Sequence, residues 1–347
     1  MIRNKRQPPF AIRAALCAAA LASACALSSC SRREKRASLF LYTTNDPFIS
    51  AFADQIRGLS AGKFSLQAFD ADNSQIIQNE QIEAAIKKHP DLMIINPVDR
   101  LGMYPIINKL KQEGVPVVFF NREPLLEDLA LWDRVYYVGA RAEQSSQIQA
   151  SLVMELFGND PRALNRHDRN ADGRIQAVIL KGEQGHQDAE IRTAEAIRSF
   201  QEGGYDLDIL TIEIADWNRD IAYDKMEGIL DAFQDRIELV LSNNDAMALG
   251  AIQRMKERGI FRDNNGNGRI DSGDSSWIPV VGIDGLDDAV LQIQAGYLYG
   301  TVVNDSIAQS RAIVDLSSRI LEGRGLADLS LEDGKYIWVE YKRFTLD

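Results

Sequence analysis

The sequence predicts an α/β fold with two doubly wound parallel-sheet domains joined by a crossover hinge. From residue 39 onward, short apolar runs alternate with amphipathic segments along almost the whole chain. The runs are nearly continuous in apolar residues, which is typical of parallel strands covered by helices on both faces. A chain of 347 residues is long enough for two such domains. No Gly/Ser-rich linker separates them, so we expect structured crossovers between the domains.

The apolar runs and the helical patterns between them define the expected elements. Strands are expected at 39–43, 64–69, 92–96, 115–120, 135–138, 177–180, 209–214, 237–241, 278–283, 298–303 and 336–341. Helices are expected at 76–86, 144–156, 189–200, 223–233, 246–258 and 307–321. We therefore expect an N-terminal domain of residues 38–139 plus about 305–325, and a C-terminal domain of residues 140–303 plus about 326–347.

The first 29 residues are predicted to be a secretory signal that is absent from the mature protein. Four basic residues and no acidic one accompany an apolar, alanine-rich stretch at 14–27, which is too short to span a bilayer as a mature helix. The stretch ends in LSSC at 27–30, which resembles the lipobox of bacterial lipoproteins, so Cys30 would carry the lipid. Residues 30–37 would then be a lipid-anchored linker. The alternative is a plain cleaved signal with an incidental cysteine.

Charge and cysteine content narrow the function. Removing residues 1–29 takes away four basic and no acidic residues, which moves the net charge from −11 to −15. Such an acidic chain is a poor nucleic-acid binder, because that affinity rests on neutralising phosphates. The three cysteines are Cys17, Cys25 and Cys30, so the domains hold no thiol for a disulfide or a zinc site. The basic run at 32–36 reads as a solvated linker within reach of anionic headgroups.

Polar side chains follow five of the apolar runs at the point where each run ends. In doubly wound sheets, ligands bind just beyond the carboxyl ends of the strands. Amides and carboxylates at five such ends, with no basic cluster among them, indicate a site for a neutral polyol, because these groups pair with hydroxyls. Helix N-capping is the alternative, and it suits Asp245 and Asp305. The candidate binding residues at these ends are Asp46, Asn121, Asn244, Asp284 and Asn304.

A second polar cluster and two aromatic residues complete the candidate site. His186 precedes a helix at a Gly-hinged turn, and Asp188 and Arg192 share one face of that helix at i, i+4. An ordinary helix start with a surface ion pair is the alternative. Phe48 and Trp217 follow strands of the two domains, and aromatic faces pack against the C–H faces of pyranose rings. Taken singly, either aromatic residue also suits a core position.

Two loops follow the pattern of calcium sites. In the first, Gly173 stands at position 6, where the loop turns sharply. Oxygens at positions 1, 3, 5 and 9 come from Asp168, Asn170, Asp172 and Gln176. Position 12 is Ile179, which cannot bind the ion, so Glu238 at the start of a strand is the candidate for the bidentate acid. A solvated acidic turn is the alternative.

The second calcium-type loop reads as an insertion before the strand expected at 278–283. It offers an aspartate at position 12, so we expect a possible second calcium site there. Its candidate ligands are Asp263, Asn265, Asn267, Arg269, Asp271 and Asp274. Both loops are expected to brace the scaffold and to take no part in catalysis.

These motifs together resemble the galactose/glucose-binding proteins of bacterial sugar ABC importers. The similar stretches spread over nearly the whole mature chain and are VVFFN at 117–121, YYVG at 136–139, GEQGHQDAE at 182–190, DKM at 224–226, NNDAM at 243–247 and GTVVND at 300–305. The resemblance implies a type I periplasmic binding protein fold hinged by three crossovers. Pro47 and Gln187 depart from the family pattern without removing a binding group, and the second calcium-type loop is an insertion relative to it.

Carried onto the matching positions, the resemblance implies that Phe48 and Trp217 sandwich a pyranose ring. The residues implied to hydrogen-bond its hydroxyls and ring oxygen are Asp46, Asn121, His186, Asp188, Arg192, Asn244, Asp284 and Asn304. The resemblance also implies one calcium ion held by Asp168, Asn170, Asp172, the Arg174 carbonyl, Gln176 and Glu238.

The function that follows is high-affinity binding of D-glucose and/or D-galactose by hinge closure, with delivery to an ABC-type permease in the cytoplasmic membrane. We expect a monomeric, membrane-anchored lipoprotein of the periplasm that is not an enzyme. A sugar-sensing input protein for chemotaxis or a sensor kinase is an alternative with the same site. A calcium-stabilised glycosidase would need two flanking carboxylates, such as Asp46 and Asp284. A sugar-responsive regulator would need a DNA-binding headpiece where the signal segment stands.

Overall fold

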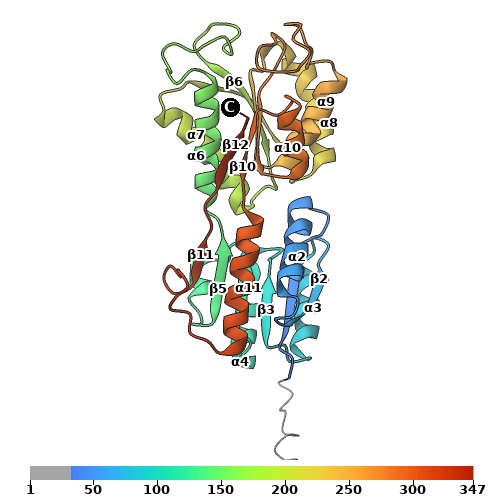
Figure 1. The fold of residues 1–347 in the computed structure, drawn as a ribbon, viewed down its shortest axis with the longest axis vertical. Coiled ribbons are helices and arrows are strands. Elements are labelled where there is room, and N and C mark those ends of the chain that lie inside the picture. The colour runs from blue at the N-terminus through green and yellow to red at the C-terminus, as the bar shows by residue number, and fades with distance from the viewer. Residues whose placement is uncertain (1–32, 347) are drawn as a thin grey trace, which may run out of the picture. The chain divides into compact units, whose positions relative to one another are not determined.

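The computed structural model describes residues 33–346, apart from the side chain of residue 234. Residues 35–347 form one compact unit, and its strands make two six-stranded sheets with helices packed against them (Figure 1). The predicted α/β fold with two mostly parallel sheets is confirmed. The expected signal segment and the lipid site at Cys30 lie outside the described residues.

The first sheet and the helices packed on it are called the first lobe. Its strand order is β11-β5-β4-β3-β1-β2, with parallel pairing throughout. The strands are β1 (Arg36–Leu41), β2 (Ser65–Asp70), β3 (Leu92–Ile95), β4 (Val117–Phe120), β5 (Val135–Gly139) and β11 (Tyr336–Trp338). The helices are α2 (Pro47–Ser60), α3 (Gln75–Ile86), η1 (Arg100–Gly102), α4 (Met103–Glu113), α5 (Leu126–Leu129) and α11 (Ser306–Glu322).

The two faces of this sheet are buried by different helices. In β1, Leu39 and Leu41 join the apolar cluster of α2 and α11, whereas Phe40 joins the cluster of α3 and α4. Successive side chains of a strand point to opposite faces, so a continuous apolar run is what a sheet covered on both sides requires.

The second sheet and its helices form the second lobe. Its order is β12-β10-β9-β8-β6-β7, parallel except for the antiparallel pair β10 and β12. The strands are β6 (Ile175–Lys181), β7 (Leu207–Ile214), β8 (Leu239–Ser242), β9 (Val280–Asp284), β10 (Gly300–Val303) and β12 (Lys342–Thr345). The helices are α6 (Ala142–Leu156), α7 (Gln187–Glu202), α8 (Arg219–Phe233), η2 (Gln234–Arg236), α9 (Asp245–Glu257) and α10 (Asp287–Gln294).

Three connections pass between the lobes, as the resemblance implies. The chain crosses from β5 to α6, returns from β10 to α11, and crosses again from β11 to β12. α6 contacts β9, β10 and β12 of the second sheet, and α11 contacts β3, β4 and β5 of the first. Each lobe is therefore discontinuous in sequence, and the crossings leave both lobes joined by short segments only.

The C-terminal segment corrects one expectation. The apolar run at 336–341 is not one strand of the second domain, because β11 pairs with β5 in the first sheet and β12 pairs with β10 in the second. Residues 326–338 therefore belong to the first lobe, where Leu326 and Leu329 also pack. Tyr341, three residues after β11, is already buried in the second lobe. Each half of the run contains a buried tyrosine, Tyr336 or Tyr341, so the aromatic composition gave no sign of the crossing.

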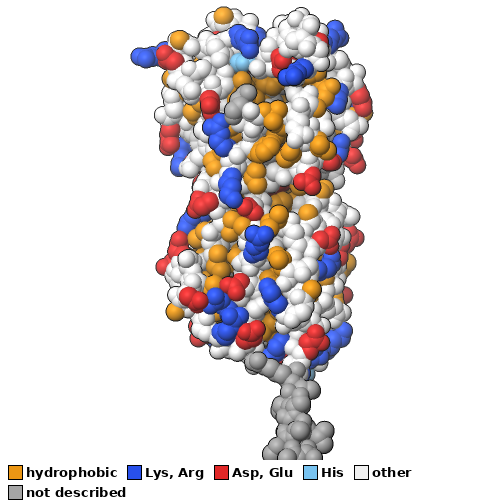
Figure 2. All heavy atoms as spheres, in the orientation of Figure 1, with side chains coloured by type: hydrophobic (Ala, Val, Ile, Leu, Met, Phe, Trp, Pro, Cys, Tyr) orange, Lys and Arg blue, Asp and Glu red, His pale blue; other side chains and the backbone are white. Residues whose placement is uncertain are grey.

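The surface of the described part of the chain gives no sign of a membrane span. None of its helices is both long and apolar enough to cross a bilayer. On the face drawn in Figure 2, hydrophobic side chains are interspersed with acidic and basic ones.

Candidate ligand-binding site

All ten candidate binding residues line one inner cavity, to which both lobes contribute. The cavity has a volume of about 30 Å³. Its lining consists of Asp46, Phe48, Asn121, His186, Asp188, Arg192, Trp217, Asn244, Asp284 and Asn304, together with Tyr42 and Arg122. Residues 42–48 and 121–122 belong to the first lobe, and the others follow strands or begin helices of the second. The carboxyl ends of the two sheets therefore meet at one site, as expected for this class of fold.

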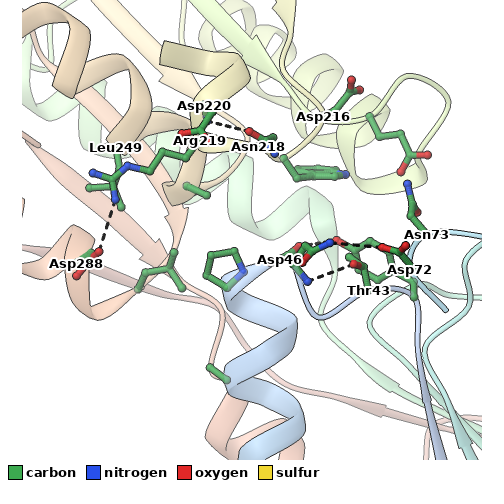
Figure 3. A pocket seen from close by; sticks show the side chains of 18 of the residues that line it. Thr43, Asp46, Asp72, Asn73, Asp216, Asn218, Arg219, Asp220, Leu249 and Asp288 are labelled. Atoms are coloured by element: carbon green, nitrogen blue, oxygen red, sulfur yellow. Dashed lines mark hydrogen bonds and ion pairs between the residues drawn. The ribbon is translucent and has the colours of Figure 1, made fainter. Parts of the chain in front are cut away.

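A larger outer cleft with a volume of about 790 Å³, drawn in Figure 3, adjoins the inner cavity. Tyr42, Asp46 and Trp217 line both spaces. The inner cavity alone has room for one or two water molecules. A pyranose seated among these side chains must therefore also fill the floor of the outer cleft, between Asp46 and Trp217.

Asp46 is held in place by the start of α2. Its Oδ1 accepts hydrogen bonds from the backbone N–H groups of Phe48 at 2.8 Å and Ile49 at 3.4 Å, and its Oδ2 accepts one from the Tyr42 hydroxyl at 2.5 Å. Pro47 occupies the first helical position, where a missing N–H costs nothing. Its departure from the family pattern therefore reinforces the helix that positions Asp46.

His186 and Asp188 come from the first turn of α7. The Nδ1 atom of His186 accepts the backbone N–H of Asp188 at 3.1 Å, so the neutral ring carries its proton on Nε2. Burial lowers the pKa of His186 well below its ordinary value, and the nearby Arg122 and Arg192 lower it further. Burial raises the pKa of Asp188. The ring is thus a neutral donor at the edge of the cavity.

Arg192 is the central cation of the site. Its side chain is 4% exposed and lies 3.5 Å from Asp188 and 3.9 Å from Asp284. Nη1 donates to the Asn243 carbonyl at 2.6 Å and Nη2 to the Tyr341 hydroxyl at 3.1 Å, whereas the buried Nε has no partner within the described chain. Burial opposes its charge, but Tyr341, Asp188 and Asp284 outweigh that effect and raise its pKa. An orphaned donor beside a polar cavity is a place for a ligand oxygen.

Asp284 is held in an unusual conformation by Asp245. The backbone of Asp284 has φ 128°, a region that residues other than glycine rarely adopt. The next two backbone N–H groups, of Gly285 and Leu286, donate to Asp245 Oδ2 at 2.7 and 2.9 Å. The prediction that Asp245 caps α9 was wrong, because Asn244 is the N-cap of that helix. The predicted cap at Asp305 is confirmed. Burial raises the pKa of Asp284 well above its ordinary value.

Replacing Asp245 with alanine is therefore expected to weaken ligand binding about tenfold or more, because it frees the turn that presents Asp284 and leaves two partly buried donors unpaired. Asp245→Asn keeps an acceptor for both amides and should retain most of the affinity. Thr301→Val removes only the third hydrogen bond of Asp245, which measures 2.7 Å, and serves as the control. Calorimetric titration measures the ligand affinities of the three variants and so checks their expected order. Equal losses of affinity in the alanine and asparagine variants would contradict the predicted role of Asp245.

Trp217 is presented by a strained turn. Asp216 and Trp217 both have positive φ, at 49° and 63°. The indole lies so close to Gly182 that a Cβ there would be 2.3 Å from its Cζ2 atom. The ring also meets His186 edge-on, with 5.1 Å between centroids. A residue larger than glycine at position 182 would therefore displace the indole. The absence of a side chain there allows the Trp217 ring to take its observed position.

The three asparagines are each fixed by a local hydrogen bond. Asn121, at φ 61°, accepts from the Asn96 amide at 3.0 Å. Asn244 accepts the Met247 N–H at 2.9 Å and donates to the Trp217 carbonyl at 3.3 Å. Asn304 accepts from the Gln309 amide. In Asn121 and Asn304 the recorded bonds use the oxygen, which leaves the amide N–H groups as donors beside the cavity.

Tyr42 and Arg122 line the inner cavity but were not among the predicted residues. The Arg122 guanidinium lies 3.9 Å from the centroid of the Tyr42 ring and donates to Glu183 across the lobes at 3.0 Å. Arg122 directly follows Asn121, so its place at a strand end was a usable signal. Tyr42 lies inside an apolar run, and nothing in the pattern distinguished it from core.

The first calcium-type loop folds around its own carboxylates. Asp168 accepts the N–H groups of Asp172 and Gly173, at 3.2 and 2.9 Å. Glu238 is buried and accepts the N–H groups of Arg169 at 2.6 Å and Asn170 at 3.4 Å. Burial raises its pKa. The Oε1 atom of Gln176 is buried without a partner among the described residues. The predicted donors thus lie together at one loop.

The second calcium-type loop repeats this arrangement. Asp263 accepts the N–H groups of Gly266, Asn267 and Gly268, and the buried Asp274 accepts those at positions 2 and 3, as Glu238 does in the first loop. Asp271 accepts from the amides of Asn265 and Asn267 at 3.2 and 2.7 Å. Within residues 33–346, no three His, Cys, Asp or Glu side chains gather closely enough to hold a metal by themselves, at either loop or elsewhere.

The two-lobed fold with a site at the facing strand ends defines a binding protein of the periplasmic type. The family model described as "Periplasmic binding protein domain" matches residues 37–325, so the chain belongs to this family. It is 34% identical to the D-galactose/methyl-galactoside binding periplasmic protein MglB of Haemophilus influenzae, over 85% of this chain and 84% of that protein. It is 29% identical to a putative rhizopine-binding protein of Rhizobium meliloti, over 75% of each.

Solved structures show the same fold. One is an ABC transporter solute binding protein of Bacillus halodurans with bound myo-inositol, at TM-score 0.73 and 24% identity, covering 90% of this chain and 94% of that one. Another is a periplasmic solute binding protein of Actinobacillus succinogenes with bound D-allose, at TM-score 0.74 and 18% identity, covering 90% and 98%.

Proposed function

We propose that the chain binds a neutral monosaccharide, D-galactose and/or D-glucose, between its two lobes and delivers it to an ABC-type permease. The observation that carries the proposal is the inner cavity, where all ten predicted side chains converge. Similarity to a galactoside-binding relative over 85% of the chain supports the hexose. Inositol and allose bound to proteins of the same fold make the identity of the ligand a matter for experiment.

The chemistry of the site suits hydroxyl groups. Three carboxylates, Asp46, Asp188 and Asp284, are acceptors, and the neutral His186 and the orphaned Nε of Arg192 are donors. Phe48 and Trp217, one from each lobe, offer the aromatic surface for the ring's C–H faces. Mixed donors and acceptors, with the charges of Arg122 and Arg192 set against three carboxylates, favour a neutral, densely hydroxylated ligand.

Binding is proposed to close the lobes. A sugar held by Asp46 and Asn121 of the first lobe and by second-lobe residues gains its full set of contacts only when both lobes reach it, so it shifts the population toward the closed state. Contacts between the lobes already exist beside the site, from Arg122 to Glu183 at 3.0 Å and from Gln187 to Glu123 at 3.3 Å. The closed form would then present both lobes to the permease.

The test is a thermal-shift panel with galactose, glucose, allose, ribose and myo-inositol, followed by an assay for sugar release from a glucoside. We expect a hexose to raise the unfolding temperature by several degrees and no glycoside to be hydrolysed, since a ligand that binds only the folded state stabilises it. Stabilisation by none of the sugars, or steady release of product, would overturn the proposal.

We further propose that the mature chain is held at the membrane through a lipid on Cys30 and works in the periplasm as a monomer. The LSSC sequence after the signal-like segment supports the lipid, and membership of the periplasmic binding protein family supports the compartment. Metabolic labelling with a radioactive fatty acid should mark the wild type and leave Cys30→Ser unlabelled.

A structural calcium ion in the first loop is also proposed. The residues fit the ion, because calcium prefers carboxylate, amide and carbonyl oxygens, and the buried Oε1 of Gln176 has no hydrogen-bond partner among residues 33–346. Asp168, Asn170, Asp172, the Arg174 carbonyl, Gln176 and Glu238 would hold it. The ion would neutralise the loop carboxylates and join the loop to the start of β8.

Chelation is expected to lower the unfolding temperature by several degrees, and returning calcium should restore it. Asp172→Ala should lose most of this response, because Asp172 is exposed and its removal leaves no core cavity. The matched variant Asp263→Ala examines the second loop, which stays a prediction from its sequence. A full calcium response in Asp172→Ala would contradict the first site.

A further inference from the structure

We propose that one edge of the first lobe rests on an anionic membrane surface when the chain is anchored at Cys30, an inference that rests on the proposed lipid anchor. The edge lies where the strands β3, β1 and β2 begin. It carries Lys35, Arg36, Lys63, Lys87 and Lys88, which we call the basic edge.

The basic edge is assembled from three separate segments. Lys35 pairs through its backbone carbonyl with Ser65 at the start of β2, two residues after Lys63. The Arg36 guanidinium donates to the carbonyls of Lys88 and His89 at 3.0 and 2.9 Å. The neighbouring strands β3, β1 and β2 thus bring the five residues to one end of the sheet.

Most of this charge is available for a partner. Among the ion pairs of residues 33–346, none includes Lys63, Lys87 or Lys88, and the Arg36 guanidinium bonds only to carbonyls. Lys35 alone is paired, with Asp91 at 3.3 Å. A chain whose net charge is −11 therefore keeps Arg36, Lys63, Lys87 and Lys88 outside the ion pairs of residues 33–346, although Glu83 acts on Lys87 from one helical turn away.

The second lobe provides an internal comparison. Strand starts lie beside helix C-termini, where the helix dipole favours cations in both lobes. At the same edge of the second sheet, however, Arg174 pairs with Asp206 at 3.0 Å, and Arg174 and Arg236 each lie 3.7 Å from Asp208. Because the helix dipole acts in both lobes, it does not explain why the basic residues at this edge have acidic partners in the second lobe and mostly lack them in the first.

The short segment between Cys30 and the basic edge indicates that the partner is the membrane surface. Only four residues separate Lys35 from Cys30, and the five steps from Cys30 to Lys35 span at most about 18 Å when fully extended. A lipid on Cys30 would hold Lys35, and with it one end of the basic edge, within that distance of the headgroups, whatever path the linker takes. Each Lys or Arg near an anionic surface is attracted to it, and the attraction fades within a Debye length. Position and charge together point to the membrane.

The first test imposes the anchor chemically. The chain from Cys30 onward has one thiol, which can be coupled to a maleimide lipid in vesicles of phosphatidylcholine with or without phosphatidylglycerol. Lysine acetylation is then mapped by mass spectrometry. We expect Lys63, Lys87 and Lys88 to lose labelling on the anionic vesicles only, with recovery in high salt, whereas the exposed Lys256 of the second lobe stays unchanged. Equal labelling on both vesicles would overturn the proposal.

The second test measures affinity without the tether. For the chain carrying Cys30→Ser, we expect Lys88→Glu to weaken sedimentation with the anionic vesicles by about tenfold or more, and Lys256→Glu to leave it unchanged. Equal losses in the two variants would indicate a general charge effect and sink the inference. Neither test depends on whether the cell attaches the lipid or whether the cleft binds sugar. A negative result in either test therefore counts against the membrane contact and not against those two proposals.

Discussion

Replacing Arg192 with leucine is expected to abolish measurable sugar binding and to cost about 3–5 kcal/mol of folding stability. The guanidinium lies between Asp188 and Asp284 and donates to the Asn243 carbonyl. Leucine would leave the half-buried Asp188 and the buried Asp284 without their nearest cation. Both would take up protons more readily, and the acceptors offered to the ligand would be lost along with the Nε donor.

Arg198→Leu is the matched control, because Arg198 lies on the same helix and its side chain is exposed. It pairs with the exposed Glu202 and with the buried Glu195, which keeps a hydrogen bond from Gln147 at 2.7 Å. It should change stability by less than about 1 kcal/mol and leave binding intact. Calorimetry and denaturant unfolding measure the two effects. If Arg192→Leu still binds a hexose with wild-type affinity, the cavity is not the site.

The second large effect is expected at Trp217. Its alanine variant removes the aromatic face offered by the second lobe, and the loss of roughly 80 Å² of apolar contact corresponds to about 2 kcal/mol, or roughly thirtyfold in affinity. Stability should fall less, because the indole is partly exposed on the cleft. Titration of the alanine variant against the wild type measures the difference.

Gly182→Ala tests the same indole indirectly. The new methyl group would displace the ring, so binding should weaken although no ligand contact is removed. Gly228→Ala, on α8, meets no atom within 4 Å and provides the control. Wild-type affinity in Gly182→Ala would show that ligand binding does not depend on the position of the Trp217 ring.

Much of the fold and site followed from the sequence because both depend on local patterns. Buried parallel strands leave continuous apolar runs, and a doubly wound sheet gathers whatever follows those runs at one edge. Asp46, Asn121, Asp284 and Asn304 were therefore recognisable as strand-end residues. These four residues come together at one site because the carboxyl ends of the two sheets face each other.

What escaped prediction depended on long-range pairing. The aromatic pattern at 336–341 does not mark the point where the run leaves one sheet for the other, because a buried tyrosine stands in each half. The role of Asp245 was hidden for the same reason: its partners Gly285 and Leu286 lie forty residues away in sequence. Tyr42 looked like core until the cation of Arg122 was found above its ring.

The central claim is that a hexose draws the two lobes together, and pulsed electron resonance between spin labels tests it most directly. Labels at Ile76→Cys on α3 and Asp224→Cys on α8, in a Cys30→Ser background, report on the two lobes from exposed positions that do not line the cleft. We predict that saturating galactose or glucose shortens and narrows the distance distribution, and that Arg192→Leu removes the change. A distribution that no hexose alters, in a folded and calcium-replete chain, would contradict the account.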